Sequence, residues 1–160
     1  DQLQELANRT GMLPYYCKTI DYRGGAYGIG ILCKVAPKNT YAGDLPGTEA
    51  RKFFLAEFDD YIVIATHFCH QEETNRQRSF EIITEYIAAN YASYTKPIYL
   101  AGDLNTSKVP AAALESWKLI RPSATTFVNT TSPSRIGYVL VYTGTAPKSR
   151  LCRPQIVSIM

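Results

Sequence analysis

The chain has 160 residues, of which 46% are hydrophobic and 19% are charged, and it contains 12 tyrosines. This composition is typical of one globular domain and excludes a disordered or fibrous protein. The formal net charge of +3 is too small and too scattered along the chain to indicate a nucleic-acid-binding surface. The four cysteines form no C-x-x-C pair, and no apolar run approaches the ~20 residues of a membrane-spanning helix.

The first half of the chain alternates β-prone runs with turns. Residues 1–11 have apolar positions at helical spacing and a glycine at the end, which predicts a short amphipathic helix. Two hairpins are predicted next, each made of two β-prone runs joined by a short turn. Their strands are expected at residues 13–20 and 27–34, and at residues 52–58 and 61–68.

The second half combines helices with buried strands. Residues 72–91 have one apolar face at helical spacing and predict the longest helix of the chain. Further elements are expected as a buried strand at 97–104, a second helix from Pro110 to residue 120, and closing strands at 137–144 and 154–160. Hairpins together with strand-helix-strand units place the fold in the α/β (α+β) class.

Two of the predicted strands end in residues that can perform chemistry. The run 61–68 carries His67, and the run 97–104 carries Asp103, with Asn105 two residues later on the same face of an extended chain. Ligand sites of open α/β sheets lie beyond the carboxyl ends of the strands, so we expect the three side chains to meet there. Asp103 and Asn105 offer oxygen ligands to a divalent metal, and His67 can hydrogen-bond an oxyanion. This chemistry suits the hydrolysis of a phosphate ester.

Plainer roles compete for the same residues. An acid and an amide after a strand often form only a turn or a helix cap, and a single histidine there is more often structural than catalytic. Arg51 and Arg135 carry a charge that suits phosphate, with a surface position as the default expectation for both. Only the conjunction of His67, Asp103 and Asn105 favours a catalytic site.

Three stretches of the sequence resemble successive motifs of a known family. They are ATHF at 65–68, YLAGDLNTS at 99–107 and TFVNTTSPSRIGYVLV at 126–141. These motifs resemble the endonuclease/exonuclease/phosphatase superfamily, metal-dependent phosphodiesterases that include DNase I-like nucleases, sphingomyelinases and inositol polyphosphate phosphatases. The resemblance implies a DNase I-like four-layer αββα sandwich, Mg²⁺ or Mn²⁺ as the ion, and in-line attack by water on a phosphate ester.

The resemblance also implies a role for each candidate residue and reveals departures from the family. Asp103 would orient the water and bind the metal with Asn105, which also holds a phosphate oxygen, while His67 stabilises developing charge. Gly137 stands where the family typically has an aspartate. The family's first strands, with their glutamate ligand, and its terminal Ser-Asp-His segment are not found in residues 1–160. The expectation is therefore a single domain that is incomplete at both termini, with a weakly bound metal and impaired activity.

Two functions remain open from the sequence. One is divalent-metal-dependent hydrolysis of a phosphate ester, whether a nucleic acid, a phospholipid head group or a sugar phosphate. The other is a catalytically silent binding module for a phosphorylated ligand or a protein partner. Absent flanking strands leave sheet edges uncovered, so an exposed apolar strip, or a partner chain that covers it, is expected beside residues 61–68 or 137–144.

Overall fold

The structure of the chain is a computed structural model that describes residues 2–120, 125–127, 134–144 and 157–159. Its elements are, in chain order, α1 (Gln2–Thr10), β1 (Leu13–Tyr22), β2 (Gly25–Cys33), β3 (Asn39–Leu45), β4 (Arg51–Glu57), β5 (Ile62–His67), α2 (Glu73–Asn90), β6 (Ile98–Asp103), the 3-10 helix η1 (Ala113–Glu115), β7 (Trp117–Ile120), β8 (Gly137–Tyr142) and β9 (Val157–Ile159). Among the described residues, no helix has the length and apolar character that a membrane span requires.

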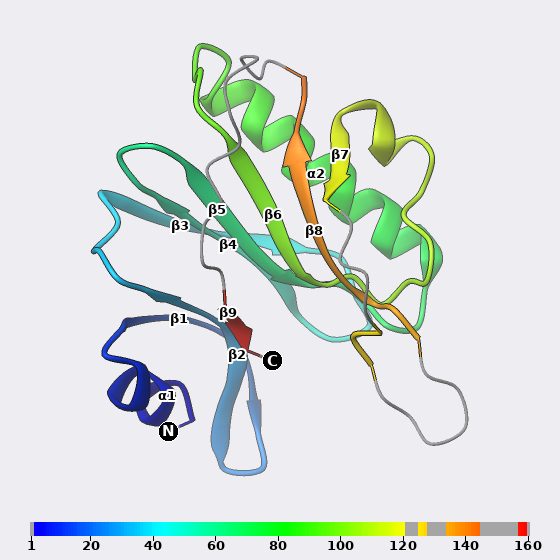
Figure 1. Cartoon of the computed structure of the whole chain (residues 1–160). Helices are drawn as coiled ribbons and strands as arrows, with labels where there is room; N and C mark the ends of the chain where they lie inside the picture. The colour runs from blue at the N-terminus through cyan, green and yellow to red at the C-terminus, as the bar shows by residue number, and fades with distance from the viewer. Residues whose placement is uncertain (1, 121–124, 128–133, 145–156, 160) are drawn as a thin grey trace.

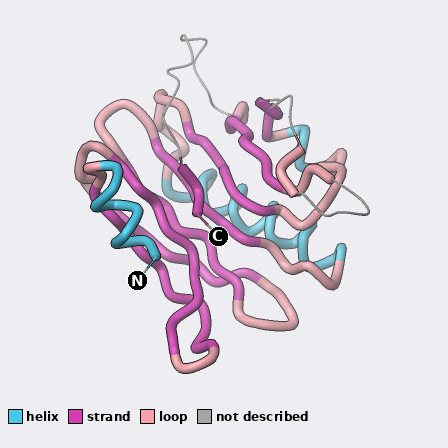
Figure 2. The backbone as a smooth tube through the Cα atoms, turned by 60° about the horizontal axis from the view of Figure 1, so that its bottom comes forward, coloured by secondary structure: helices cyan, strands magenta, loops and turns pink. Residues whose placement is uncertain are grey.

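Two sheets pack face to face, and each carries a helix on its outer face (Figure 1). The smaller sheet has the strand order β1-β2-β9, and the larger has the order β3-β4-β5-β6-β8-β7. Helix α1 covers the smaller sheet, where Leu3 and Ala7 pack on Leu32 of β2. Helix α2 covers the larger sheet through Phe80 and Ile83. Figure 2 shows the same layers from another side. This arrangement is the αββα sandwich that the family resemblance implies.

The larger sheet buries both of its faces because successive side chains of a strand point to opposite sides. On β5, Ile62 and Ile64 face α2, whereas Val63 and Ala65 face the smaller sheet. Strands β5 and β6 are parallel, and α2 forms the crossover between them. The carboxyl ends of β5 and β6 therefore meet at one end of the sandwich.

The helix predicted from Pro110 to residue 120 is wrong. The chain makes only the short helix η1 and then strand β7, which pairs antiparallel with β8. Trp117 explains the difference, because its side chain is fully buried and its Nε1 donates a hydrogen bond to Thr84 Oγ1 at 2.9 Å. The alanines at 111–113 favour a helix locally, but the burial of Trp117 and the pairing with β8 override this preference.

The remaining predictions for the elements have mixed outcomes. The other predicted helices and hairpin strands are present, whereas β3 is an additional strand whose mostly exposed residues give little alternation to recognise. Of the strand expected at 154–160, only Val157–Ile159 lies within the described residues. Strands β5 and β8 each have a neighbouring strand on both sides, so the apolar strip expected beside them is wrong.

Candidate active site

The parallel pairing of β5 and β6 brings two of the candidate residues together. The register pairs His67 with Asp103, the last residue of each strand. His67 continues the alternation of Val63 and Ala65, so both side chains lie on the face of the larger sheet that looks toward the smaller one. The His67 Nε2 atom lies 3.9 Å from Asp103 Oδ2, and the two side chains are only 16% and 9% exposed.

Asn105 joins this pair through a turn and not through an extended strand. Strand β6 ends at Asp103, and Asn105 has a φ of +47°, in the left-handed region. Its backbone N–H donates to Asp103 Oδ1 at 2.8 Å, which is an Asx-type turn. The assumption of strand alternation up to Asn105 is therefore wrong, although the backbone N–H of Asn105 stays bonded to Asp103. Asp103 and Asn105 thus form a turn, which was the structural alternative for these two residues. The turn uses only Oδ1 of Asp103, so Oδ2 takes no part in it.

The segment between β5 and α2 forms one side of the site. Phe68 N donates to Asp103 O at 2.9 Å, and Phe68 O accepts a hydrogen bond from Asn105 Nδ2 at 2.9 Å. Arg76 Nη1 donates to the carbonyl oxygens of the next two residues at 3.2 and 3.3 Å. These bonds attach the segment both to the end of β6 and to α2. The amide group of Asn105 is consequently held in one orientation.

Gly102 allows β5 and β6 to approach closely just before Asp103. Its φ is +148°, and a Cβ atom at this position would lie 1.9 Å from the carbonyl oxygen of Thr66. A side chain here would push the two strands apart and displace Asp103. The glycine of the G-D-L-N stretch is thus required by the backbone on which the site is built.

Tyr27 is a residue of the site that the sequence did not reveal. Its hydroxyl lies 3.1 Å from His67 Nδ1, and the two ring centroids are 6.3 Å apart. Tyr27 belongs to β2, so the smaller sheet supplies this contact across the sandwich. The hydrogen bond fixes the orientation of the imidazole, which turns Nε2 toward Asp103.

The titration behaviour of the site follows from burial. Burial, and after it the charge of Arg51, lowers the pKa of His67 to about 4. The imidazole is therefore neutral at pH 7, so its contact with Asp103 at 3.9 Å is not an ion pair. Burial raises the pKa of Asp103, against the effects of the Asn105 N–H and of Arg51. Arg51 is itself buried, so the default expectation of a surface position is wrong for this residue.

The strand on the other side of Asp103 offers no carboxylate. In the antiparallel pairing of β6 and β8, Gly137 is the register partner of Asp103. The N–H groups of Ile136 and Gly137 both donate to Thr126 Oγ1, at 2.9 and 2.8 Å. A Cβ atom at position 137 would lie 3.2 Å from Thr126 Cβ, so Thr126 occupies part of the space that an aspartate would need.

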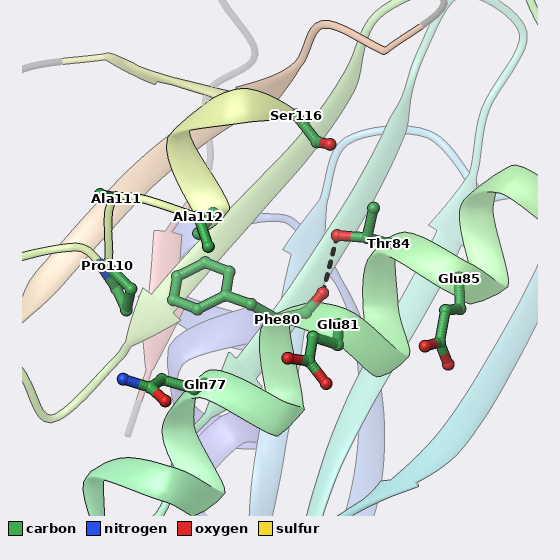
Figure 3. Close-up of a pocket in the computed structure, with 10 residues that line it drawn as sticks. Gln77, Phe80, Glu81, Thr84, Glu85, Pro110, Ala111, Ala112 and Ser116 are labelled. Atoms are coloured by element: carbon green, nitrogen blue, oxygen red, sulfur yellow. Dashed lines mark hydrogen bonds between the residues drawn. The ribbon is translucent and has the colours of Figure 1, made fainter.

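A pocket of about 400 Å³ lies elsewhere, between α2 and the segment before β7 (Figure 3). Its lining consists of Gln77, Phe80, Glu81, Thr84, Glu85, Pro110, Ala111, Ala112, Ala113 and Ser116. Phe80 and Ala113 belong to the core between the larger sheet and α2. The pocket therefore lies on the opposite face of the larger sheet from His67 and Asp103, and it carries none of the candidate residues.

Comparison with known proteins identifies the family of the chain. The sequence model of the Endonuclease/Exonuclease/phosphatase family matches residues 1–158. The chain belongs to this family. No curated protein matches it at the sequence level.

Solved structures of the endonuclease/exonuclease/phosphatase fold resemble the chain over most of its length. An endonuclease/exonuclease/phosphatase from Bacteroides vulgatus is 18% identical over 88% of this chain and 69% of its own, with a TM-score of 0.68. The human Nocturnin catalytic domain with a bound sulfate anion is 12% identical over 88% of this chain and 64% of its own, with a TM-score of 0.64. A mannosyl-6-phosphatase from Bacteroides thetaiotaomicron is 14% identical over 98% of this chain and 76% of its own, with a TM-score of 0.63. At these identities the likeness shows the fold.

Proposed function

We propose that the chain hydrolyses phosphate esters slowly, with a divalent metal ion, at the site formed by His67, Asp103 and Asn105. The observation that carries the proposal is the carboxylate of Asp103. It is largely buried at the end of a strand, and only its Oδ1 atom is used by the turn. Its Oδ2 atom lies 3.9 Å from the neutral imidazole, beyond hydrogen-bond distance, and therefore remains available to a ligand. Because the chain belongs to this family, we propose that the ligand is a phosphate ester and that the reaction is its hydrolysis.

The donor set fits a metal ion that shares its coordination with the substrate. Mg²⁺ and Mn²⁺ prefer oxygen ligands, and Mg²⁺ is usually held by one or two carboxylates together with substrate phosphate. Asp103 Oδ2 and the amide oxygen of Asn105 are the oxygen donors here, since Asn105 Nδ2 is engaged with Phe68. Among the described residues no group of three His, Cys, Asp or Glu side chains could hold a metal ion, so binding without substrate is expected to be weak. When bound, the ion would neutralise charge on the phosphoryl oxygens.

The side chains of the chain supply orientation and proton transfer. Asp103 Oδ2 accepts a hydrogen bond from the attacking water and holds it beside the phosphorus. When the Tyr27 hydroxyl donates to His67 Nδ1, the ring proton of the neutral imidazole is on Nε2. This N–H then donates to a phosphoryl oxygen and stabilises the charge that develops there. The second N–H of the Asn105 amide group, which is not donated to Phe68 O, would donate to another oxygen of the same group.

We expect slow turnover of phosphate esters because of Gly137. The register partner of Asp103 provides no second carboxylate, where the family typically has an aspartate. Loss of one general acid–base component typically costs about 10²- to 10⁴-fold in rate. Relative to a typical enzyme turnover of about 10 s⁻¹, we expect roughly 10⁻³ to 10⁻¹ s⁻¹.

The second candidate function is a silent binding module, and Gly137 is also the observation that favours it. A site that retains Asp103, His67 and Asn105 can hold a phosphate group even where turnover has been lost. The two candidates differ in one respect only, which is whether the bound ester is cleaved.

Turnover measurements distinguish the candidates. The wild-type chain, Asp103→Ala and Gly137→Asp are assayed with Mg²⁺, with Mn²⁺ and with EDTA against bis-p-nitrophenyl phosphate, single-stranded DNA, a phospholipid head-group ester and a sugar phosphate. We expect slow metal-dependent turnover of at least one substrate, lost in Asp103→Ala. Gly137→Asp should gain less than about tenfold, because the new side chain crowds Thr126. Binding of an ester with no turnover under any condition would establish the binding module.

The partner chain expected from the sequence stays a prediction. Leu13 and Tyr16 on β1, an edge strand of the smaller sheet among the described residues, are 43% and 46% exposed. Light scattering at increasing protein concentration tests whether the chain associates with itself.

A further inference from the structure

Strand β3 is an edge of the larger sheet that lacks the usual protection against pairing. Among the described residues it pairs with β4 on one side and has no neighbouring strand on the other. All seven of its residues pair with β4 without a register shift. Its one charged side chain, Asp44, is bound by Lys52 of β4, and the strand contains no proline. A long, regular and nearly uncharged edge presents backbone N–H and C=O groups on which another strand can pair.

The other sheet edges in the described part of the chain differ from β3. Strand β1 contains Pro14 and Lys18, and its register with β2 shifts between Lys18 and Ile20. Strand β7 has only four residues and β9 only three. Proline, lysine, an irregular register and short length all hinder pairing between sheet edges. Of these edges, β3 is therefore the one best suited to receive another strand.

The sequence of β3 is complementary to itself. In an antiparallel pair with a second copy, a two-fold axis through Ala42, the middle residue, lets all seven residues pair. Pro46 follows the strand and has no N–H to donate, so the pairing ends there. In this register Asp44 lies opposite Thr40 of the second copy, and no like charges face each other across the pair. Registers that place Asp44 opposite its own copy are disfavoured by repulsion.

The same register makes an aromatic contact on the face that α2 covers. Tyr41 is 44% exposed, and its ring stacks on Tyr86 with 4.5 Å between the centroids. Opposite Tyr41 lies Gly43 of the second copy. A Cβ atom at Gly43 would lie 2.2 Å from Phe53 Cε1, so the Phe53 ring covers the glycine. Each Tyr41 therefore meets the Phe53 ring of the other copy, a contact that occurs twice by symmetry and stabilises cross-strand pairs.

We propose that the chain forms a symmetric dimer through β3, in which the two larger sheets join as one continuous antiparallel sheet. The partner is a second copy of this chain, and Ala42 lies on the two-fold axis. One strand pair buries less than the ~1,200 Å² of stable interfaces, so the dimer is weak. Strand β4 separates β3 from β5 and β6, which carry His67 and Asp103, so the dimer does not depend on the proposed function.

Sedimentation velocity at increasing protein concentration tests for the dimer. We expect the wild-type chain to pass from monomer to dimer with a dissociation constant on the order of 100 µM. Ala42→Lys places two lysines opposite each other on the axis, so it should raise this constant by at least about tenfold. Tyr16→Lys is the matched control, because it adds the same charge at an exposed position of β1. The control should change the constant by less than about twofold.

Cysteine cross-linking tests the register. The Cα atoms of directly opposite residues in an antiparallel pair are about 4.5–5.5 Å apart, within the span of a disulfide. With oxidised glutathione, Ala42→Cys should therefore form a covalent dimer. Thr40→Cys is the matched control, because its opposite residue is Asp44, and it should form no covalent dimer beyond that of the wild-type chain. Both positions are exposed on the edge strand.

Three outcomes would overturn the proposal. The first is a wild-type chain that stays monomeric at about 1 mM, well above the expected dissociation constant. The second is equal weakening by Ala42→Lys and Tyr16→Lys, or weakening by Tyr16→Lys alone, which would place the interface on β1. The third is equal cross-linking of Ala42→Cys and Thr40→Cys, or no cross-linking of Ala42→Cys. The cysteine pair decides if Ala42→Lys does not fold.

Discussion

Replacement of Gly102 by alanine should strongly destabilise the chain. The added methyl group would lie 1.9 Å from the carbonyl oxygen of Thr66, so β5 and β6 would have to separate by about 1.1 Å to reach even 3.0 Å. Overpacking of this kind costs about 1–3 kcal/mol. The φ of +148° adds strain for any residue with a side chain, which costs about 1–3 kcal/mol more. We expect the free energy of unfolding to fall by roughly 2–6 kcal/mol, a large part of the 5–15 kcal/mol that is usual.

Urea denaturation, followed by far-ultraviolet circular dichroism, measures this change. Gly25→Ala is the matched control, because a Cβ atom there would meet only the carbonyl oxygen of Tyr22, at 3.6 Å. The control should change the free energy of unfolding by less than about 1 kcal/mol. A displacement of Asp103 by about 1 Å would also lower any turnover by about 10²-fold. A Gly102→Ala variant that is as stable as the control would refute the claim that close strand approach builds the site.

Three further predictions concern single side chains. Tyr27→Phe removes the hydrogen bond to His67 Nδ1, so the imidazole signals should shift in NMR spectra and stability should fall by about 0.5–1.5 kcal/mol; unchanged signals would contradict the contact. Because burial lowers the pKa of His67 from 6.5 to about 4, the unfolded chain binds a proton that the folded chain excludes. The free energy of unfolding should therefore fall as the pH drops from about 6.5 to about 4, by at most about 3 kcal/mol before allowance for partial exposure, and His67→Gln should not show this component. Trp117→Phe leaves Thr84 without its indole donor and opens space in the core, so denaturation should report a loss of about 2–4 kcal/mol; a loss below about 1 kcal/mol would argue against the buried strand β7.

The pairing of His67 with Asp103 could be predicted from the sequence for a physical reason. Each residue ends an apolar run long enough for a buried strand, and a helix separates the two runs. A strand-helix-strand unit makes parallel neighbours, whose carboxyl ends meet at the same edge. The meeting of the two side chains therefore follows from local patterns and one topological rule. The position of Asn105 did not follow, because the left-handed turn after Asp103 ends the alternation of the strand.

The sequence predicted neither the place of Tyr27 in the site nor the burial of Arg51. The contact between Tyr27 and His67 joins residues 40 positions apart, and it depends on how the two sheets pack. The burial of Arg51 depends on the fold of the segments around Gly47 and Cys69, which have no regular pattern. The helix predicted across Trp117 was wrong for the same reason. Burial of Trp117 against α2 and pairing of β7 with β8 outweigh a local preference for helix.

The most direct test of the central claim is to locate a bound metal ion. Mn²⁺ broadens the NMR signals of nearby nuclei, so it is added to the chain together with inorganic phosphate. We expect the signals of Asn105 and of the His67 ring to lose intensity first, and we expect this effect to be absent in Asp103→Ala. Broadening that persists in Asp103→Ala, or that is strongest at Glu81 and Glu85 on α2 while the signals of His67 and Asn105 stay sharp, would contradict the proposed site.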